Sequence, residues 1–468
     1  MGLGSHPQPR IKVAVLTHPS GEACLTASGE TNLNMSLWRM ILTAINLVGV
    51  RFGGAALGLV SQILLARLLP QRDVGVVLMG MSAAAILSLI MTAGYPSLTM
   101  TILPRYYALG RETLAKAFHR AVWHDSLIVS AALLLLVAAI WLWAPIDPAL
   151  KTALIFGAMM APASSLIRIT SSVANSRRRF PLSYIPDFIF RPGLLLVYLL
   201  AMWALGVAPS FVAVMSVVVA ATYVVALGQA FVLGSGVLPA RLKAGRHDLA
   251  PALRNRAASM VLIAAVAMAF ADIVTLTGGI FLPAGEVAQL GIAIRLAALA
   301  GFVTQVTQNF VLPDLSAAIV KRDRPAANAL ILRINLIAIS AISVCVVITV
   351  FFGPFILGIF GAGYAGAHWP LVFFMVSQLF RAAGGMNQHL LSLDGFQTRS
   401  LTACVLAVAL LLVSASFLTP LLGLMGMAIS VLLAEAAWAA ILGFQAQRHS
   451  GYRGDIFAGF RFRRQPAE

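Results

Sequence analysis

Charged residues are scarce in this chain. Only 10% of its 468 residues are Asp, Glu, Lys or Arg, whereas 60% are hydrophobic. A water-soluble domain carries about 25% charged residues, because its surface has to be hydrated. The composition therefore excludes an ordinary soluble protein and indicates that most of the surface faces lipid.

Cysteine is scarce as well. Cys24, Cys345 and Cys404 lie far apart in the sequence and form no CxxC pair. Such spacing predicts neither a disulfide framework nor a zinc site. We interpret all three as small apolar packing residues, and we predict no metal site.

Motifs of catalysis and of nucleotide binding are missing. The sequence contains no Walker A loop, no GxSxG or HExxH motif and no dinucleotide fingerprint, which are the common signatures of such sites. The apolar runs leave no room for a soluble nucleotide-binding domain. We therefore predict a protein that is not an enzyme and has no cofactor, with coupling to protons or sodium ions left open.

Long apolar runs, in contrast, are abundant. Crossing the ~30 Å hydrocarbon core of a bilayer takes roughly 20 helical residues. Twelve runs reach this length and predict an all-α, polytopic membrane protein. The predicted spans are 38–66, 74–98, 121–143, 150–174, 182–204, 210–233, 258–281, 286–311, 328–352, 368–392, 399–418 and 422–446.

The formal net charge of +17 comes from 33 Lys and Arg against 16 Asp and Glu. A basic chain can bind nucleic acid, but here most basic residues lie in short loops between apolar runs. They concentrate in the even-numbered connections and at both ends, which is the pattern of the positive-inside rule. We predict a multi-pass protein of the bacterial inner membrane with both termini in the cytoplasm, and no nucleic-acid partner.

The longest basic connection divides the predicted helices into two sets of six. We expect a disordered polar tail, an N-terminal lobe, a basic cytoplasmic linker, a C-terminal lobe and a basic cytoplasmic tail. These five segments are 1–35, 36–235, 236–257, 258–446 and 447–468. Met35 precedes a stretch typical of a natural start, so we leave open whether Met1 or Met35 is the first residue.

The two lobes share a short sequence pattern. The stretch "LLPQRDVG" from Leu68 enters the second predicted helix, and "FLPAGEVA" from Phe281 enters the eighth. Both contain Leu-Pro, two residues, an acid and Val. Membrane transporters are commonly built from duplicated halves, so this pattern favours two related lobes around a central cavity.

Ionisable residues within the spans are the main candidates for function. A charge at mid-bilayer costs at least about 2.5–3.5 kcal/mol, so it normally faces a bundle interior or water. Arg51, Arg295 and Arg381 lie near the middle of their spans, and we expect them to line one polar cavity. Arg168 and Arg333 lie closer to the ends, where snorkelling to the interface is the simpler interpretation.

Acidic and amide side chains accompany these arginines. Asp187 and Arg191 are spaced i,i+4 and can pair on one helix face, either as a structural pair or as part of a ligand site. We expect Asp187, Asp272 and Glu435 to pair with arginines or to couple transport to an ion. The expected polar lining is Gln62, Gln305, Gln308, Asn309 and Gln378. A cavity with surplus arginine suits an anionic substrate, because the guanidinium fork matches phosphate oxygens; its arginines would be Arg51, Arg191, Arg295 and Arg381.

Two segments resemble the polysaccharide and O-antigen flippases, members of the superfamily of multidrug, oligosaccharidyl-lipid and polysaccharide exporters. The first, Ser61–Met79, precedes and enters the second predicted helix; the second, Ile356–Ser400, surrounds the tenth. The matching positions are Ala66, Arg67, Leu68, Pro70, Asp73, Gly75, Phe360, Gly361, Tyr364, Gly395 and Arg399. Asp272, with the Gly-rich turn and Glu286 that follow it, is similar to the seventh helix of the family.

The resemblance implies two six-helix lobes around a central cavity, the fold of multidrug and toxin extrusion proteins. It also implies alternating-access transport of an undecaprenyl-diphosphate-linked oligosaccharide, with membrane lipid and, in addition, a polysaccharide polymerase and a chain-length regulator as expected partners. The glycan and the oligomeric state stay open.

Three other functions remain as alternatives. A multidrug or cation antiporter of the same fold would have a carboxylate in its first helix, where this chain has Arg51. A peptidoglycan-precursor flippase usually has two more helices. A membrane scaffold or polymerase is the third, although a polymerase would be expected to have a large periplasmic loop.

Overall fold

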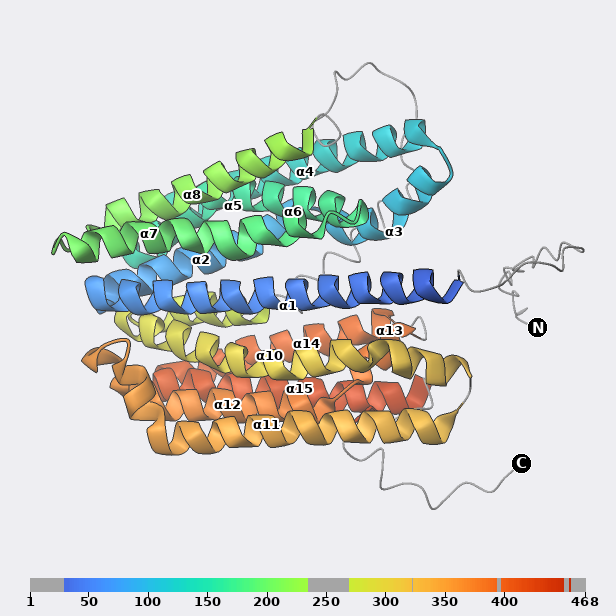
Figure 1. The fold of residues 1–468 in the computed structure, drawn as a ribbon. Helices are drawn as coiled ribbons and strands as arrows, with labels where there is room; N and C mark the ends of the chain where they lie inside the picture. Colours follow the sequence, from blue (N-terminus) through green and yellow to red (C-terminus); the bar gives the residue numbers. More distant parts are fainter. Residues whose placement is uncertain (1–28, 235–268, 322, 394–396, 450–453, 456–468) are drawn as a thin grey trace, which may run out of the picture. The chain divides into compact units, whose positions relative to one another are not determined.

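The computed structural model describes residues 29–234, 269–321, 323–393, 397–449 and 454–455. Residues 1–28 of the predicted tail, the predicted linker 236–257 and most of the predicted C-terminal tail lie outside this part. Within it, every regular element is a helix (Figure 1). Ten of the described helices are long and apolar enough to cross a membrane, so the chain is a multi-pass membrane protein.

The first half contains helices α1 (Gly29–Leu68), α2 (Gln71–Met91), α3 (Tyr95–Ala108), α4 (Glu112–Trp143), α5 (Pro148–Ser176), α6 (Phe180–Ile185), α7 (Arg191–Ala204) and α8 (Phe211–Leu233), with a π-helical turn η1 (Pro186–Phe190) between α6 and α7. Helix α1 crosses the boundary between two compact units, Met1–Gly49 and Val50–Glu468, and the packing below concerns the second unit. The predicted tail 1–35 is too long, because no Pro or Gly interrupts the helix between Gly29 and Gly49.

The second half begins with an apolar helix described over Ala269–Phe281. It continues with α10 (Ala284–Val320), α11 (Arg324–Gly358), the 3₁₀ helix η3 (Ala362–Ala367), α12 (His368–Gly384), α13 (Asn387–Leu393), α14 (Gln397–Leu422) and α15 (Leu424–His449). Large apolar side chains point outwards on these helices and on those of the first half. Trp143, Phe231 and Phe351 are 83%, 86% and 73% exposed, as a surface that faces lipid requires.

Three predicted spans are interrupted. The predicted span 74–98 divides at Ala93 and Gly94, both with positive φ, and α3 restarts with a proline in its first turn. The predicted span 182–204 contains the η1 turn, since Pro186 and Pro192 cannot donate to the helical ladder. The predicted span 368–392 breaks at Gly385, where φ is +55°.

A segment after α15 occupies the last of these breaks. The Gly454 carbonyl accepts hydrogen bonds from Met386 N at 3.0 Å and from Asn335 Nδ2 at 2.8 Å. Gly454 N donates to Asn387 Oδ1 at 2.7 Å. A side chain at Gly385 would overlap the Gly454 carbonyl. A short buried piece of the C-terminal tail therefore fills the break between α12 and α13.

The helices pack in two sets that meet at α2 and α10. Helices α2 to α8 contact one another, helices α10 to α15 contact one another, and α2 packs on α10. Gly75 makes this contact close, because a β-carbon there would overlap the Ala284 carbonyl. The two stretches with the shared Leu-Pro pattern thus lie against each other, and the glycine of the first one is needed for their approach.

A charged cavity and an amide cavity

A cavity of about 310 Å³ lies among α1, α2, η1, α7, the helix Ala269–Phe281 and α10. Five charged side chains line it, and we call it the cationic cavity: Arg51, Asp187, Arg191, Asp272 and Arg295. Ser61 and Gln62 add polar groups, and most of the remaining wall is apolar. The two sets of helices both contribute, and the arginines outnumber the aspartates by three to two.

Arg51 enters the cavity from α1. Its guanidinium carbon lies 5.2 Å from the centre of the Tyr184 ring, a distance at which a cation is attracted to the aromatic face. Its Nε is buried and has no hydrogen-bond partner in the described part of the chain. Gly54, one turn on, lets Phe188 of the η1 turn approach α1, because a β-carbon at Gly54 would lie 2.5 Å from the Phe188 oxygen. This close approach brings Arg51 to the wall formed by η1.

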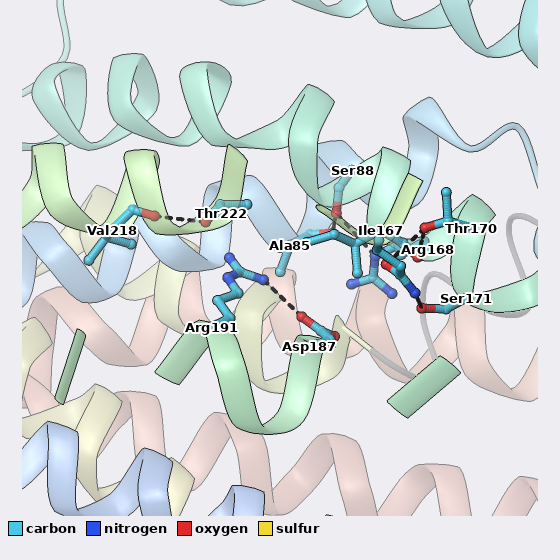
Figure 2. A network of polar contacts seen from close by, with 11 residues as sticks. Ala85, Ser88, Ile167, Arg168, Thr170, Ser171, Asp187, Arg191, Val218 and Thr222 are labelled. Atoms are coloured by element: carbon cyan, nitrogen blue, oxygen red, sulfur yellow. Dashed lines mark hydrogen bonds and ion pairs between the residues drawn. The ribbon is translucent and has the colours of Figure 1, made fainter. Parts of the chain in front are cut away.

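Asp187 and Arg191 form the predicted ion pair across the η1 turn. Arg191 Nη1 lies 3.3 Å from Asp187 Oδ1 (Figure 2). An arginine has five N–H donors, so this single contact leaves most of the fork of Arg191 available to a ligand. Turns of the π type inside α-helices are often found at functional sites.

Arg295 and Asp272 occupy the side of the cavity formed by the second half of the chain. The charge of Asp272 acts favourably on Arg295, but in the described part of the chain no carboxylate oxygen lies within 4.0 Å of the Arg295 nitrogens. Arg295 Nη1 is buried, and none of the described residues forms a hydrogen bond with it. The Arg295 guanidinium is thus close to a counter-charge and still has an unused donor.

Arg168 of α5 is half-buried and faces α2. Its Nε donates to Ser88 Oγ at 3.1 Å (Figure 2). It lines a neighbouring cavity of about 230 Å³ whose wall also includes Asp187. Sequence reasoning missed this position, because nothing in the sequence indicates that Ser88 of α2 faces Arg168 of α5. Arg333, in contrast, is exposed on α11, as snorkelling would require.

A second cavity of about 320 Å³ lies among α10, α12, α13 and α15. We call it the amide cavity, since four glutamines line it: Gln305, Gln308, Gln378 and Gln388. His389, Thr304 and Trp438 line it too. The predicted residues Gln305, Gln308 and Gln378 are therefore brought together, whereas Gln62 lies in the cationic cavity. The side chain of Asn309 lies outside the described residues.

Arg381 belongs to the amide cavity, which corrects the expectation of three arginines in one chamber. Its Nε lies 3.8 Å from Glu435 Oε2, and its guanidinium carbon lies 4.9 Å from the centre of the Trp438 ring. The reason is its place on α12, one turn before the Gly384–Gly385 break, where it faces α15. Glu435 is only 2% exposed and has its charge compensated there. Trp438 and Gln388 were not foreseen, since the sequence does not indicate which face of its helix each of them occupies.

Solved structures with a similar fold are transporters. An inward-facing multidrug resistance MATE family transporter of the MOP superfamily gives a TM-score of 0.65 at 16% identity, covering 85% of this chain and 94% of that one. The lipid II flippase MurJ, in an inward closed conformation, gives 0.66 at 12% identity over 86% and 87%. A MOP superfamily transporter from Pyrococcus furiosus, described as having a binding pocket of reverse polarity, gives 0.53 at 15% identity over 86% and 95%.

Sequence comparisons add no relative. No protein-family model matches the chain, and a search among curated proteins gives no match. At identities of 12% to 16% the likeness concerns the course of the backbone. The chain therefore has the helical membrane fold that MATE transporters and MurJ share.

Proposed function

We propose that this protein is a flippase that moves undecaprenyl-diphosphate-linked oligosaccharides across the bacterial inner membrane for surface polysaccharide synthesis. The observation that carries the proposal is the surplus of positive charge in the cationic cavity. Three arginines there face two aspartates, and Arg51 and Arg295 each retain a buried N–H without a partner. An anionic ligand would supply the missing acceptors.

A diphosphate suits this cavity better than a single carboxylate. Its oxygens accept several hydrogen bonds at once, and the planar guanidinium fork offers them in matching pairs. Arg51 comes from α1 and Arg295 from α10, so a diphosphate between them would link the two halves of the chain. Coulomb attraction is also stronger in a poorly hydrated cavity than in water.

The transport cycle follows from the two sets of helices. In alternating access, the sets rock against each other around a site near the bilayer midplane. The sugar-diphosphate part would occupy the cavity, and the polyprenyl chain would stay in the bilayer among membrane lipids. With both termini in the cytoplasm, cargo would enter from the cytoplasmic leaflet and leave towards the polymerase and chain-length regulator outside. Asp187, Asp272 and Glu435 would release arginines when protonated, which would couple the cycle to a proton gradient.

A multidrug or cation antiporter is the second candidate. The largely apolar wall of the cationic cavity and its two aspartates would suit a lipophilic cation. In that case Asp187 and Asp272 would bind the drug, and Arg51, Arg191 and Arg295 would repel it. The arginine surplus therefore favours the flippase.

Ligand binding separates these functions. Purified protein in nanodiscs is titrated with a short polyprenyl diphosphate and, separately, with the lipophilic cation tetraphenylphosphonium. We expect Arg51→Gln and Arg295→Gln each to weaken diphosphate binding on the order of tenfold or more, since a hydrogen bond to a charged group contributes about 1.5–3 kcal/mol. Arg295→Lys keeps the charge but not the planar guanidinium group, and we expect it to lose less diphosphate affinity than Arg295→Gln.

Arg333→Gln is the matched control, because it removes an arginine from a transmembrane helix outside both cavities. We expect it to bind the diphosphate like the unmodified chain. Wild-type diphosphate affinity in both glutamine variants would contradict the proposal. Tight binding of the cation that Asp272→Asn abolishes would favour the antiporter.

A further inference from the structure

The amide cavity differs from the cationic cavity in its chemistry. Its one arginine, Arg381, is paired with Glu435, so its charges compensate each other. Four glutamines, a histidine, a threonine and a tryptophan make up most of the remaining polar wall. A glutamine amide both donates and accepts hydrogen bonds. The wall therefore matches an uncharged ligand whose own groups also donate and accept, as sugar hydroxyls and acetamido groups do.

Two buried groups of this wall have no partner among the described residues. Thr304 Oγ1 and Trp438 Nε1 form no hydrogen bond there, and both side chains are only 4% exposed. A buried polar group without a partner is unfavourable, and each such group in a folded protein calls for an explanation. Both residues line the cavity, and a sugar hydroxyl that reached these two groups could accept from the indole N–H and donate to the threonine hydroxyl.

Helix α10 forms a wall of both cavities. At 3.6 residues per turn, Arg295 and Phe302 lie on nearly the same line of the helix and face the cationic cavity. Gly301, Thr304 and Gln308 lie further round the helix and face the amide cavity.

The strip of α10 between these two faces is accessible. Ala298 and Gln305 lie between them on the circumference of the helix, and both are exposed. Ala298 is ~4.5 Å and Gln305 ~15 Å further along the helix axis than Arg295, at 1.5 Å per residue. The two cavities are thus separated along α10 by exposed residues, which a ligand bound at Arg295 would follow to reach the amide cavity.

From this placement we infer that the amide cavity is a sugar subsite, which takes the uncharged sugar residues nearest to a diphosphate held at Arg295. The inference rests on the proposed function, because it needs the diphosphate in the cationic cavity. It also specifies the glycan: Glu435 lines the cavity and Arg381 is already paired, so a neutral sugar is favoured there over an acidic one.

The test compares probes with and without a sugar, on the full chain in nanodiscs. The probes are a bare short polyprenyl diphosphate and the same lipid carrying one N-acetylhexosamine, one hexose, one 6-deoxyhexose or one hexuronic acid. We expect at least one neutral glycosylated probe to bind about tenfold tighter than the bare one, a gain of about 1.4 kcal/mol, and the hexuronic acid to bring no gain.

Thr304→Val is the decisive variant. It keeps the shape of the side chain and removes a hydroxyl that has no partner in the protein, so we expect an unchanged or raised melting temperature. We expect it nevertheless to lose most of the sugar-dependent gain and to bind the bare diphosphate normally. Gln305→Leu should behave in the same way, and Gln447→Leu, at an exposed glutamine outside both cavities, is the control.

The outcomes separate this inference from the proposed function. If no neutral sugar increases affinity, or if the gain survives in Thr304→Val and Gln305→Leu, the sugar subsite is wrong while arginine-dependent binding of the bare diphosphate can still hold. If the bare diphosphate binds equally well to Arg295→Gln, the proposed function itself fails.

Discussion

At the residue scale, the partner of each buried arginine decides what it can do. Arg381 lies over Trp438 and pairs with Glu435, so its charge is compensated. Arg51 rests on Tyr184 and Arg295 has an unpaired Nη1, so both can still bind an anion. Burying a charge is costly unless it is paired, and the proposed anionic ligand would lower this cost at Arg51 and Arg295.

Tyr364 gives a prediction about pH at the same scale. It lies in η3, outside the spans, and burial raises the pKa of its hydroxyl to about 12. An unfolded tyrosine titrates near pH 10, so the folded chain holds the proton more tightly. This contribution to stability is complete below about pH 10 and is lost as the pH rises towards about 12, by up to about 1.4 kcal/mol per pH unit.

The measurement is thermal unfolding in detergent between about pH 8 and about pH 11. We expect the melting temperature of the unmodified chain to fall more steeply at the alkaline end than that of Tyr364→Phe. The variant should be nearly as stable at neutral pH, because the Tyr364 hydroxyl has no hydrogen-bond partner among the residues that the structure describes. Parallel curves for the two proteins would show that Tyr364 does not titrate in this way.

At the element scale, the two segments that resemble the flippase family bind each other. Arg67 Nε donates to the Ile359 carbonyl at 2.7 Å. Gln71 Nε2 and Gln289 Nε2 both donate to the Gly363 carbonyl, at 3.1 Å and 2.9 Å. The start of α2, the start of α10 and η3 are thereby joined at one end of the bundle. We call these three bonds the η3 clasp.

Opening of the helices at this end requires the clasp to break. In a chain without its native cysteines, spin labels at Arg72→Cys and Ala365→Cys report the distance between α2 and η3. We expect Gln71→Leu combined with Gln289→Leu to increase the population with a longer distance, because each lost bond removes about 0.5–1.5 kcal/mol. The same labels with Gln447→Leu are the control. An unchanged distance distribution in the double variant would show that the clasp does not hold this end closed.

At the scale of the whole molecule, the orientation in the membrane stays a prediction. The connections after the first and ninth predicted spans meet in the clasp, and both are odd-numbered; Gln289 lies at the start of the eighth predicted span. The positive-inside rule assigns odd-numbered connections to the outside. The basic turn at Arg177–Arg179, after α5, follows the fourth predicted span and is assigned to the cytoplasm.

Cysteine labelling in intact cells tests this orientation. With a reagent that does not cross the membrane, we expect Ala365→Cys to be labelled from outside and Arg178→Cys to be labelled only after the cells are opened. Native cysteines are removed in both proteins. Labelling of each variant after lysis is required, because it shows that the introduced cysteine can react with the reagent. The reverse pattern would place the termini outside and would contradict the proposed direction of transport.

The sequence by itself determined the membrane class and the all-helical fold; it predicted twelve spans, and ten of the described helices are long and apolar enough to cross a membrane. Length and hydropathy suffice for this, because a bilayer accepts only segments of defined length and composition. It also indicated the pair of Asp187 and Arg191, since their spacing is local. The positions of the helix breaks at Pro186 and Gly385 follow from local backbone chemistry as well.

Only the tertiary structure decided which of these residues share a cavity. Arg51 and Arg295 are 244 positions apart in the numbering and line the same cavity, whereas Arg381 pairs with Glu435. Arg168 of α5 donates a hydrogen bond to Ser88 of α2. Such choices depend on how helices distant in sequence pack and on which face each one presents, and neither hydropathy nor charge counting contains that information.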